Sequence, residues 1–128
     1  MCLACRAGGI DAMFRVRRRD DGSYFRAMEL GAHGIMLPHC NDPQDAASCV
    51  RQVKFPPEGN RSIDGIEPHA AFAWVPTADY VRQANDGTFV VVQIEEPPAV
   101  ERVDEIAAVP GVDVLFVGPG DLGTRYAD

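Results

Sequence analysis

Short runs of apolar residues recur along this 128-residue chain, and longer segments separate them. The runs at 11–16, 34–38, 89–94 and 112–117 are each predicted to form a strand. The last two are apolar enough for strands that are covered on both faces. Strands that alternate with helix-length segments predict a parallel sheet and therefore an α/β fold.

The segment that begins at residue 42 carries the signature of a helix start. Asp42 can cap the helix, Pro43 suits its first position, and Asp45 places an acid in its first turn. Apolar side chains then recur at helical spacing, at Ala46, Cys49, Val50 and Val53. We therefore expect a helix that packs on the sheet through these four positions.

Three further helices are expected, separated by one long loop. The first covers 24–30 and ends at Gly31, because glycine can take the left-handed conformation that closes a helix. The second spans 77–85, with its first residue as the cap. The third opens at Pro97, with an apolar stripe at Val100, Val103, Ile106 and Ala107. Residues 55–76 lack sustained periodicity and predict a loop of roughly 20 residues, a length that usually signals function or mobility.

Composition and charge restrict the class of protein. The chain has 46% hydrophobic residues and a length that fits one folded domain. Its net charge of −7 argues against a nucleic-acid partner, and the basic run at 15–19, with Arg15 considered separately below, is interpreted as a solvated loop rather than an anion site. No apolar stretch reaches the roughly 20 residues that cross a bilayer. The first residues lack the apolar centre of a signal peptide, so a cytoplasmic protein without membrane contact is expected.

Four cysteines raise the question of a metal or disulfide site. Cys2 and Cys5 form one C-x-x-C pair, but a structural zinc site needs a second matched pair. Cys40 and Cys49 do not supply it. Small, reduced, partly buried thiols are expected instead.

Two acidic residues stand where the last two strands should stop. Glu95 follows the strand at 89–94, and Asp121 follows the strand at 112–117 after a Gly-Pro-Gly turn. The carboxyl ends of parallel strands meet at one sheet edge, where α/β proteins place their chemistry. From spacing alone two interpretations are equally favoured. The two acids either share a ligand, or one caps a helix while the other forms a salt bridge.

Six short segments stand out for their order and spacing. They are 14–16 (FRV), 29–38 (ELGAHGIMLP), 55–61 (FPPEGNR), 84–86 (AND), 92–95 (VQIE) and 118–122 (GPGDL). Together they extend over nearly the whole chain. In this order they resemble the HpcH/HpaI family of class II, metal-dependent aldolases, which act on 4-hydroxy-2-oxoheptanedioate or 2-keto-3-deoxy-sugar acids.

The resemblance implies a fold. The family is a (β/α)8 barrel of about 250 residues. Residues 1–128 would then form a single partial barrel domain with only the central strands, about the third to the sixth, truncated at both ends. The segment that carries the family's catalytic histidine and the two closing strands are expected to be absent.

The resemblance also implies a ligand set. Glu95 and Asp121 match the family's two ligands for a divalent cation, which is Mg²⁺, Mn²⁺ or Co²⁺. A hard cation bound through oxygen can stabilise the enolate of pyruvate. The backbone of Gly118, Pro119, Gly120 and Asp121 would bind the substrate carboxylate. Gly120 replaces a common alanine, so this turn is expected to be looser, and a plain tight turn is the alternative.

Arg15 and Glu29 match two further positions of the family. Arg15 would bind a keto-acid oxygen and the enolate formed later, because a guanidinium donates two parallel hydrogen bonds. Glu29 stands where the family has an aspartate that orients the catalytic histidine of a neighbouring subunit; an exposed helix-end acid is the alternative. His33 and His69 are expected to be structural or solvent-facing. His39 lies near the presumed site and is a weaker candidate for substrate contact.

Three functions remain after these observations. The first is a lyase that reversibly cleaves a 2-keto-3-deoxy or 4-hydroxy-2-oxo acid to pyruvate and an aldehyde, in a homo-oligomer. The second is a truncated, non-catalytic chain that retains metal or pyruvate binding, or serves as an oligomer partner through its open sheet edges. The third is a citrate-lyase-like enzyme that acts on acyl-CoA esters, which the Gly-Pro-Gly-Asp turn and the PPEGNR loop favour less.

Overall fold

A four-stranded parallel sheet forms the centre of the molecule. The computed structural model describes residues 1–17 and 23–127. The strands lie side by side in chain order: β1 (Met13–Arg15), β2 (Gly34–Leu37), β3 (Phe89–Ile94) and β4 (Val114–Val117). The predicted α/β fold with a parallel sheet is therefore confirmed.

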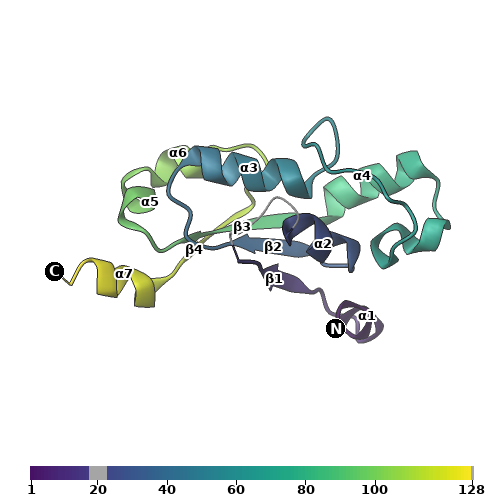
Figure 1. Ribbon diagram of the computed structural model, residues 1–128, viewed down its shortest axis with the longest axis horizontal. Helices are drawn as coiled ribbons and strands as arrows, with labels where there is room; N and C mark the ends of the chain where they lie inside the picture. The colour runs from purple at the N-terminus through teal and green to yellow at the C-terminus, as the bar shows by residue number, and fades with distance from the viewer. Residues whose placement is uncertain (18–22, 128) are drawn as a thin grey trace.

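Helices connect the strands and lie mainly along one side of the sheet. Figure 1 shows α2, α3 and α6 on this side, and α7 beyond the end of β4. The helical elements are α1 (Cys2–Ala7), α2 (Ser23–Glu29), α3 (Pro43–Val53), the 3₁₀ helix η1 (Pro68–Ala73), α4 (Thr77–Gly87), α5 (Pro97–Glu101), α6 (Val103–Ala107) and α7 (Pro119–Arg125). Among the described residues, no helix is long and apolar enough to cross a membrane. Of the basic run at 15–19, Arg18 and Arg19 lie outside the described residues.

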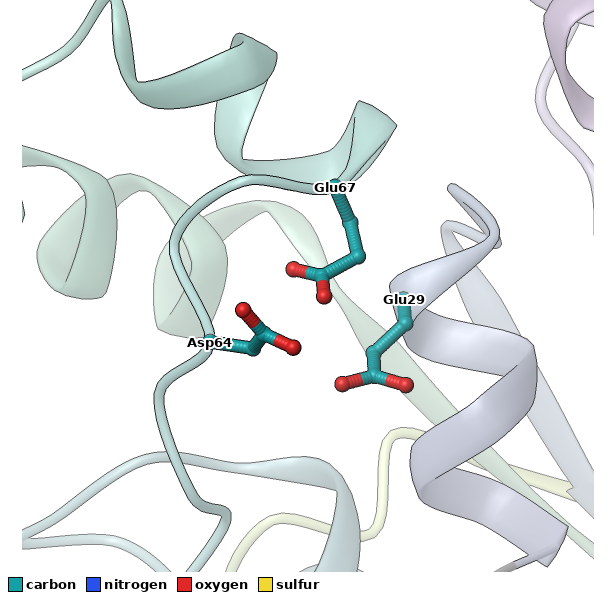
Figure 2. Close-up of side chains that lie close together, drawn as sticks. All are labelled: Glu29, Asp64 and Glu67. Carbon is teal, nitrogen blue, oxygen red and sulfur yellow. The ribbon is translucent and has the colours of Figure 1, made fainter.

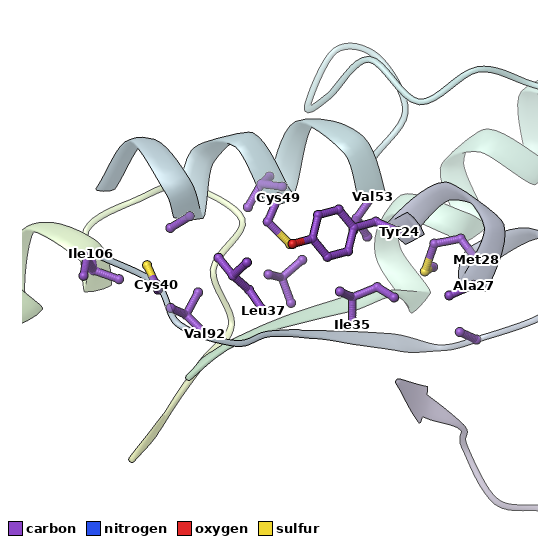
Figure 3. Packing of buried hydrophobic residues seen from close by; sticks show 14 of the residues in the cluster. Tyr24, Ala27, Met28, Ile35, Leu37, Cys40, Cys49, Val53, Val92 and Ile106 are labelled. Carbon is purple, nitrogen blue, oxygen red and sulfur yellow. The ribbon is translucent and has the colours of Figure 1, made fainter. Parts of the chain in front are cut away.

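The main hydrophobic core fills the space between the sheet and these helices. Figure 3 shows Ile35, Leu37 and Val92 of the strands packed towards Cys49 and Val53 of α3. All four positions of the apolar stripe predicted for α3 are buried. The Asp42 side chain accepts the backbone N–H of Asp45 at 2.8 Å. Helix α3 therefore begins and packs as its sequence predicts.

The prediction of one continuous helix from Pro97 onward is wrong. The segment is divided into α5 and α6 at Arg102, whose φ of −115° and ψ of 22° interrupt the helix. Val100 and Ala107 are exposed, while Ile106 is completely buried. The interruption separates the two halves, and one continuous buried apolar stripe does not form.

Two other local predictions are corrected. Thr77 is the first residue of α4 rather than its cap, and Pro76 before it makes no side-chain cap hydrogen bond. The long segment 55–76 contains η1. Burial and the Cys40 thiol raise the pKa of the Cys49 thiol to about 12, and none of the four cysteines is in a disulfide.

The two faces of the sheet differ in a way that positions the candidate site. Residues that point to the helices, such as Ile35 and Val92, are in the core. Successive side chains along a strand alternate between faces. The other face therefore carries Arg15 on β1, Gln93 on β3 and Phe116 on β4, of which Phe116 is 49% exposed. Arg15 and Gln93 are thus the polar side chains among mostly apolar ones on the face opposite the core.

Candidate functional site

Glu95 is the most unusual side chain of the described residues. It follows β3 directly and is completely buried, with 0% exposure. Its Oε1 accepts the backbone N–H of His39 at 2.8 Å, whereas its buried Oε2 has no hydrogen-bond partner. An unpaired carboxylate oxygen away from water is costly. A divalent cation would satisfy it, because oxygen is the ligand that hard cations prefer.

Gly118 lies against this unpaired oxygen. A Cβ atom at Gly118 would stand 2.8 Å from both Oε2 and Cβ of Glu95, closer than real contacts allow. The Gly118 N–H donates to the Ile94 carbonyl at 2.9 Å, which holds the turn beside the end of β3. Only glycine therefore fits here. The same turn opens α7, which carries the exposed Asp121 in its first turn.

Arg15 supplies the positive charge of the site, and its partner is the neutral amide of Gln93. Nη1 of Arg15 donates to Oε1 of Gln93 at 3.4 Å, across the intervening strand β2. Gln93 lies two residues before Glu95 and thus on the same face of the sheet. Its Nε2 also lies 3.0 Å from the position of a Cβ at Gly118. Gln93 belongs to one of the sequence motifs, but no role was predicted for it, because only the fold brings its side chain to Arg15.

His39 adopts a backbone conformation that is uncommon for a residue with a side chain. Its φ is 50°, in the left-handed region. This conformation aims its N–H at Glu95, and its Nδ1 lies 3.3 Å from Glu95 Oε1 and 2.9 Å from Glu96 Oε1. Glu96 in turn pairs with Arg125 at 2.8 Å. Glu96 and Arg125 were not predicted from the sequence, in which a doubled acid after a strand is the only signal for them.

Glu29 lies elsewhere in the molecule. It ends α2, near the amino ends of the strands, whereas Glu95 follows the carboxyl end of β3. Figure 2 shows the carboxylates of Glu29, Asp64 and Glu67 turned towards one another, and their oxygens lie within 4.8 Å. Burial and the hydrogen bond that protonated Glu67 can donate to Asp64 raise the pKa of Glu67. The structure therefore does not bring Glu29 to Arg15 and Glu95 within one chain.

The other two histidines are remote from this site. Nδ1 of His33 accepts the backbone N–H of Ala12 at 3.4 Å and lies 3.5 Å from Asp11. His69 contacts the Tyr80 hydroxyl at 3.2 Å, and burial together with the Arg61 charge lowers the pKa of His69 to about 4. Both side chains make structural contacts, as expected.

Comparison with known proteins identifies what the chain is similar to. The profile of a family described as HpcH/HpaI aldolase/citrate lyase matches residues 2–126. A 2-dehydro-3,6-dideoxy-6-sulfogluconate aldolase of Pseudomonas putida is 38% identical over 121 residues, which cover 94% of this chain and 47% of that protein. A 5-keto-4-deoxy-D-glucarate aldolase of Salmonella gallinarum is also 38% identical, over 98% of this chain and 48% of its own length.

A solved structure agrees with the sequence relatives. The crystal structure of an HpcH/HpaI aldolase from Desulfitobacterium hafniense superposes with a TM-score of 0.92 at 32% identity, covering 98% of this chain and 48% of that one. The chain thus spans about half the length of the curated relatives that it matches. The four-stranded sheet described above corresponds to part of a barrel.

Proposed function

This chain belongs to the HpcH/HpaI aldolase/citrate lyase family, and we propose that it acts as a metal-dependent aldolase. The reaction is the reversible cleavage of a 2-keto-3-deoxy or 4-hydroxy-2-oxo acid into pyruvate and an aldehyde. The observation that carries the proposal is the buried, unpaired Oε2 of Glu95 beside Gly118. A buried carboxylate with one oxygen left without a hydrogen-bond partner is suited to binding a cation rather than to forming a structural salt bridge.

Glu95 and Asp121 are the proposed protein ligands of that cation, which is Mg²⁺, Mn²⁺ or Co²⁺. They come from the end of β3 and the first turn of α7, two segments held together by the hydrogen bond from Gly118 to Ile94. When bound, the cation would supply positive charge where an enolate of pyruvate develops. Two protein ligands leave positions for oxygen atoms of a keto acid.

Arg15 is proposed to bind the keto acid from the opposite side. Its guanidinium is permanently charged, and Gln93 orients it through the contact at 3.4 Å. Two parallel N–H groups suit a carboxylate or a keto oxygen, and they gain strength as negative charge grows on that oxygen. Arg15 would thereby favour the enolate over the uncharged keto form.

The turn before Asp121 is proposed to bind the substrate carboxylate through fewer amides than the resemblance implied. The Gly118 N–H already donates to Ile94, and Pro119 has no N–H. The remaining donors are the N–H groups of Gly120 and Asp121, which lie in the first turn of α7 and so have no partner within the helix. These two amides are the proposed contacts.

Glu29 keeps its proposed role only in an oligomer. It lies at the amino edge of the sheet, away from Glu95, so it can act on a catalytic residue only in another copy of the chain. A homo-oligomer is therefore part of the proposal, together with a keto acid and an aldehyde as substrates.

The proposal is tested by metal-dependent pyruvate release from a 2-keto-3-deoxy-sugar acid. Release is expected to require Mn²⁺ or Mg²⁺, to stop on addition of a chelator, and to fall at least about 100-fold in Glu95→Gln. Glu101→Gln is the matched control, because this exposed acid on α5 loses the same charge outside the site. Turnover that survives both chelation and Glu95→Gln would contradict the assignment. The same assay on a longer protein, which contains this chain together with any strands encoded beside it, measures what those strands contribute to turnover.

A further inference from the structure

Three residues beyond the proposed ligands form a continuous polar link around Glu95. We propose that His39, Glu96 and Arg125 act as a clamp that positions the cation ligands Glu95 and Asp121. The inference rests on the proposed function, because it assigns roles towards the same cation. It concerns this chain's own side chains, and their contacts can be tested without turnover.

Glu96 is the centre of the clamp. Its Oε1 lies 2.9 Å from Nδ1 of His39 and 2.8 Å from Nη2 of Arg125. The Glu96 side chain is 13% exposed, whereas those of His39 and Arg125 are 44% and 42% exposed. One shielded carboxylate oxygen thus joins the residues after β2, the residues after β3 and the last turn of α7.

His39 transmits this contact to Glu95. Its Nδ1 lies 3.3 Å from Glu95 Oε1 and 2.9 Å from Glu96 Oε1, and because ionised carboxylates only accept hydrogen bonds, these contacts favour an N–H at Nδ1. The imidazole is thereby held against Glu96 while the backbone stays at a φ of 50°. That backbone conformation directs the His39 N–H to Glu95 Oε1 at 2.8 Å. With Oε1 held, Oε2 is the oxygen left for the cation.

Arg125 transmits the contact to Asp121. The two residues are four positions apart in α7, so they lie on the same face of the helix. The ion pair between Arg125 and Glu96 holds that face towards the end of β3. Asp121 has an exposed side chain, and this pair restrains the helix carrying it in addition to the hydrogen bond from Gly118 to Ile94.

Positioning and simple charge make opposite predictions for Arg125. If only charge mattered, removal of a cation beside a cation site would strengthen metal binding. If Arg125 positions α7, its removal weakens binding although it relieves repulsion. For Glu96 both effects have the same sign, so Arg125 is the decisive position.

The experiment measures the affinity of the chain for Mn²⁺ alone, from the electron paramagnetic resonance signal of free Mn²⁺ during titration. Glu96→Gln is expected to weaken binding about 10-fold, the effect typical of residues that orient metal ligands. Arg125→Gln is expected to weaken it about threefold, and Arg125→Lys, which keeps a charged donor, to restore most of the loss. In the metal-free protein, amide hydrogen exchange in α7 is expected to be faster in Glu96→Gln than in the wild type.

Two control variants match these changes outside the clamp. Glu101→Gln removes an exposed acid six residues from Glu95, and Arg82→Gln breaks a surface ion pair with Asp79 that is also 2.8 Å long. Both should bind Mn²⁺ within about twofold of the wild type. Melting temperatures of all variants show whether a loss of binding follows from unfolding. Should Glu96→Gln unfold, the surface residue Arg125 still decides the question.

The outcomes separate the clamp from the proposed function. Binding of Mn²⁺ by Arg125→Gln that equals or exceeds that of the wild type overturns the clamp. If Glu95→Gln abolishes binding in the same series, the proposed cation site still stands. A wild-type chain that does not bind Mn²⁺ overturns both.

Discussion

Two groups of acidic residues lie at opposite edges of the same sheet, and they differ in what surrounds the carboxylates. At the carboxyl edge, Glu95 is completely buried, with one oxygen held by a backbone N–H and the other unpaired. At the amino edge, Glu29, Asp64 and Glu67 approach within 4.8 Å of one another, and Asp64 is exposed. The second group is crowded, yet of these four carboxylates only that of Glu95 is completely kept away from water.

The difference shows that close approach of carboxylates and burial of an unpaired carboxylate oxygen are separate properties. In the crowded group, burial and the hydrogen bond that protonated Glu67 can donate to Asp64 raise the pKa of Glu67. Glu95 instead has a backbone N–H, the His39 imidazole and Gly118 around it. Its Oε2 stays buried without a hydrogen-bond partner, and this is the atom that the proposed cation would satisfy.

Substitution of one acid from each group should give the largest contrast. Glu95→Gln is expected to weaken Mn²⁺ binding at least about 100-fold, or about 2.7 kcal/mol. Glu67→Gln should change it less than about twofold. Because an unpaired buried carboxylate is costly, Glu95→Gln should also raise the free energy of unfolding, by about 1 kcal/mol. Isothermal titration with Mn²⁺ and urea denaturation measure the two effects; equal binding losses in both variants would remove the distinction between the groups.

The glycines of the turn test how closely Gly118 packs on Glu95. Gly118→Ala places a Cβ 2.8 Å from Glu95 Oε2 and is expected to lower the free energy of unfolding by about 2 kcal/mol. Gly120→Ala meets nothing within 4 Å and should change it by less than about 0.5 kcal/mol. Chemical denaturation of the two variants side by side provides the measurement. An unchanged free energy of unfolding in Gly118→Ala would mean that the turn does not pack closely against Glu95.

The amino-edge region should respond to acid through His69. Burial lowers the pKa of His69 from 6.5 to about 4, so between these values the unfolded chain binds a proton that the folded chain does not. The free energy of unfolding should therefore fall as the pH drops from 6.5 to 4, with about 1 kcal/mol attributable to this residue after allowance for solvent. In His69→Gln that part of the pH dependence should disappear. Parallel stability curves of the variant and the wild type would contradict the assignment.

The smallest effect should come from relief of repulsion in the crowded group. The pKa of Glu67 is raised in the folded chain, so its ionised form opposes folding at neutral pH. Glu67→Gln should then raise the free energy of unfolding at pH 7 by about 0.5 kcal/mol, and the gain should vanish below about pH 4.5, where this carboxyl is protonated in both states. Thermal denaturation at the two pH values measures the difference. A destabilised variant at pH 7 would show that Glu67 makes a favourable contact instead.

Local patterns predicted the elements well where one short-range cause acts. The cap at Asp42 and the four apolar positions of α3 follow from neighbours within the helix, and β3 has the predicted bounds. The division of α5 from α6 at Arg102 was not predicted, because the spacing of apolar residues runs on through the interruption. Periodicity reports which side chains are apolar and does not report a local turn of the backbone.

The candidate site divides in the same manner. The positions of Glu95 and Gly118 at strand ends can be read along the chain, whereas the Arg15–Gln93 contact joins residues 78 positions apart. The same holds for His39, whose N–H reaches Glu95 across 56 positions. Neither contact has a local signal, so Gln93, Glu96 and Arg125 were missed.

The sequence by itself determined the alternation of strands and helices, the family resemblance and which acids end buried strands, because these depend on the order of residues along the chain. Only the tertiary structure decided that Glu95 is completely buried with one unpaired oxygen, that Glu29 lies at the opposite edge of the sheet, and that Glu96 links three segments. The physical reason is that desolvation and hydrogen-bond satisfaction belong to the packed neighbourhood of an atom. That neighbourhood is assembled from segments that the sequence holds far apart.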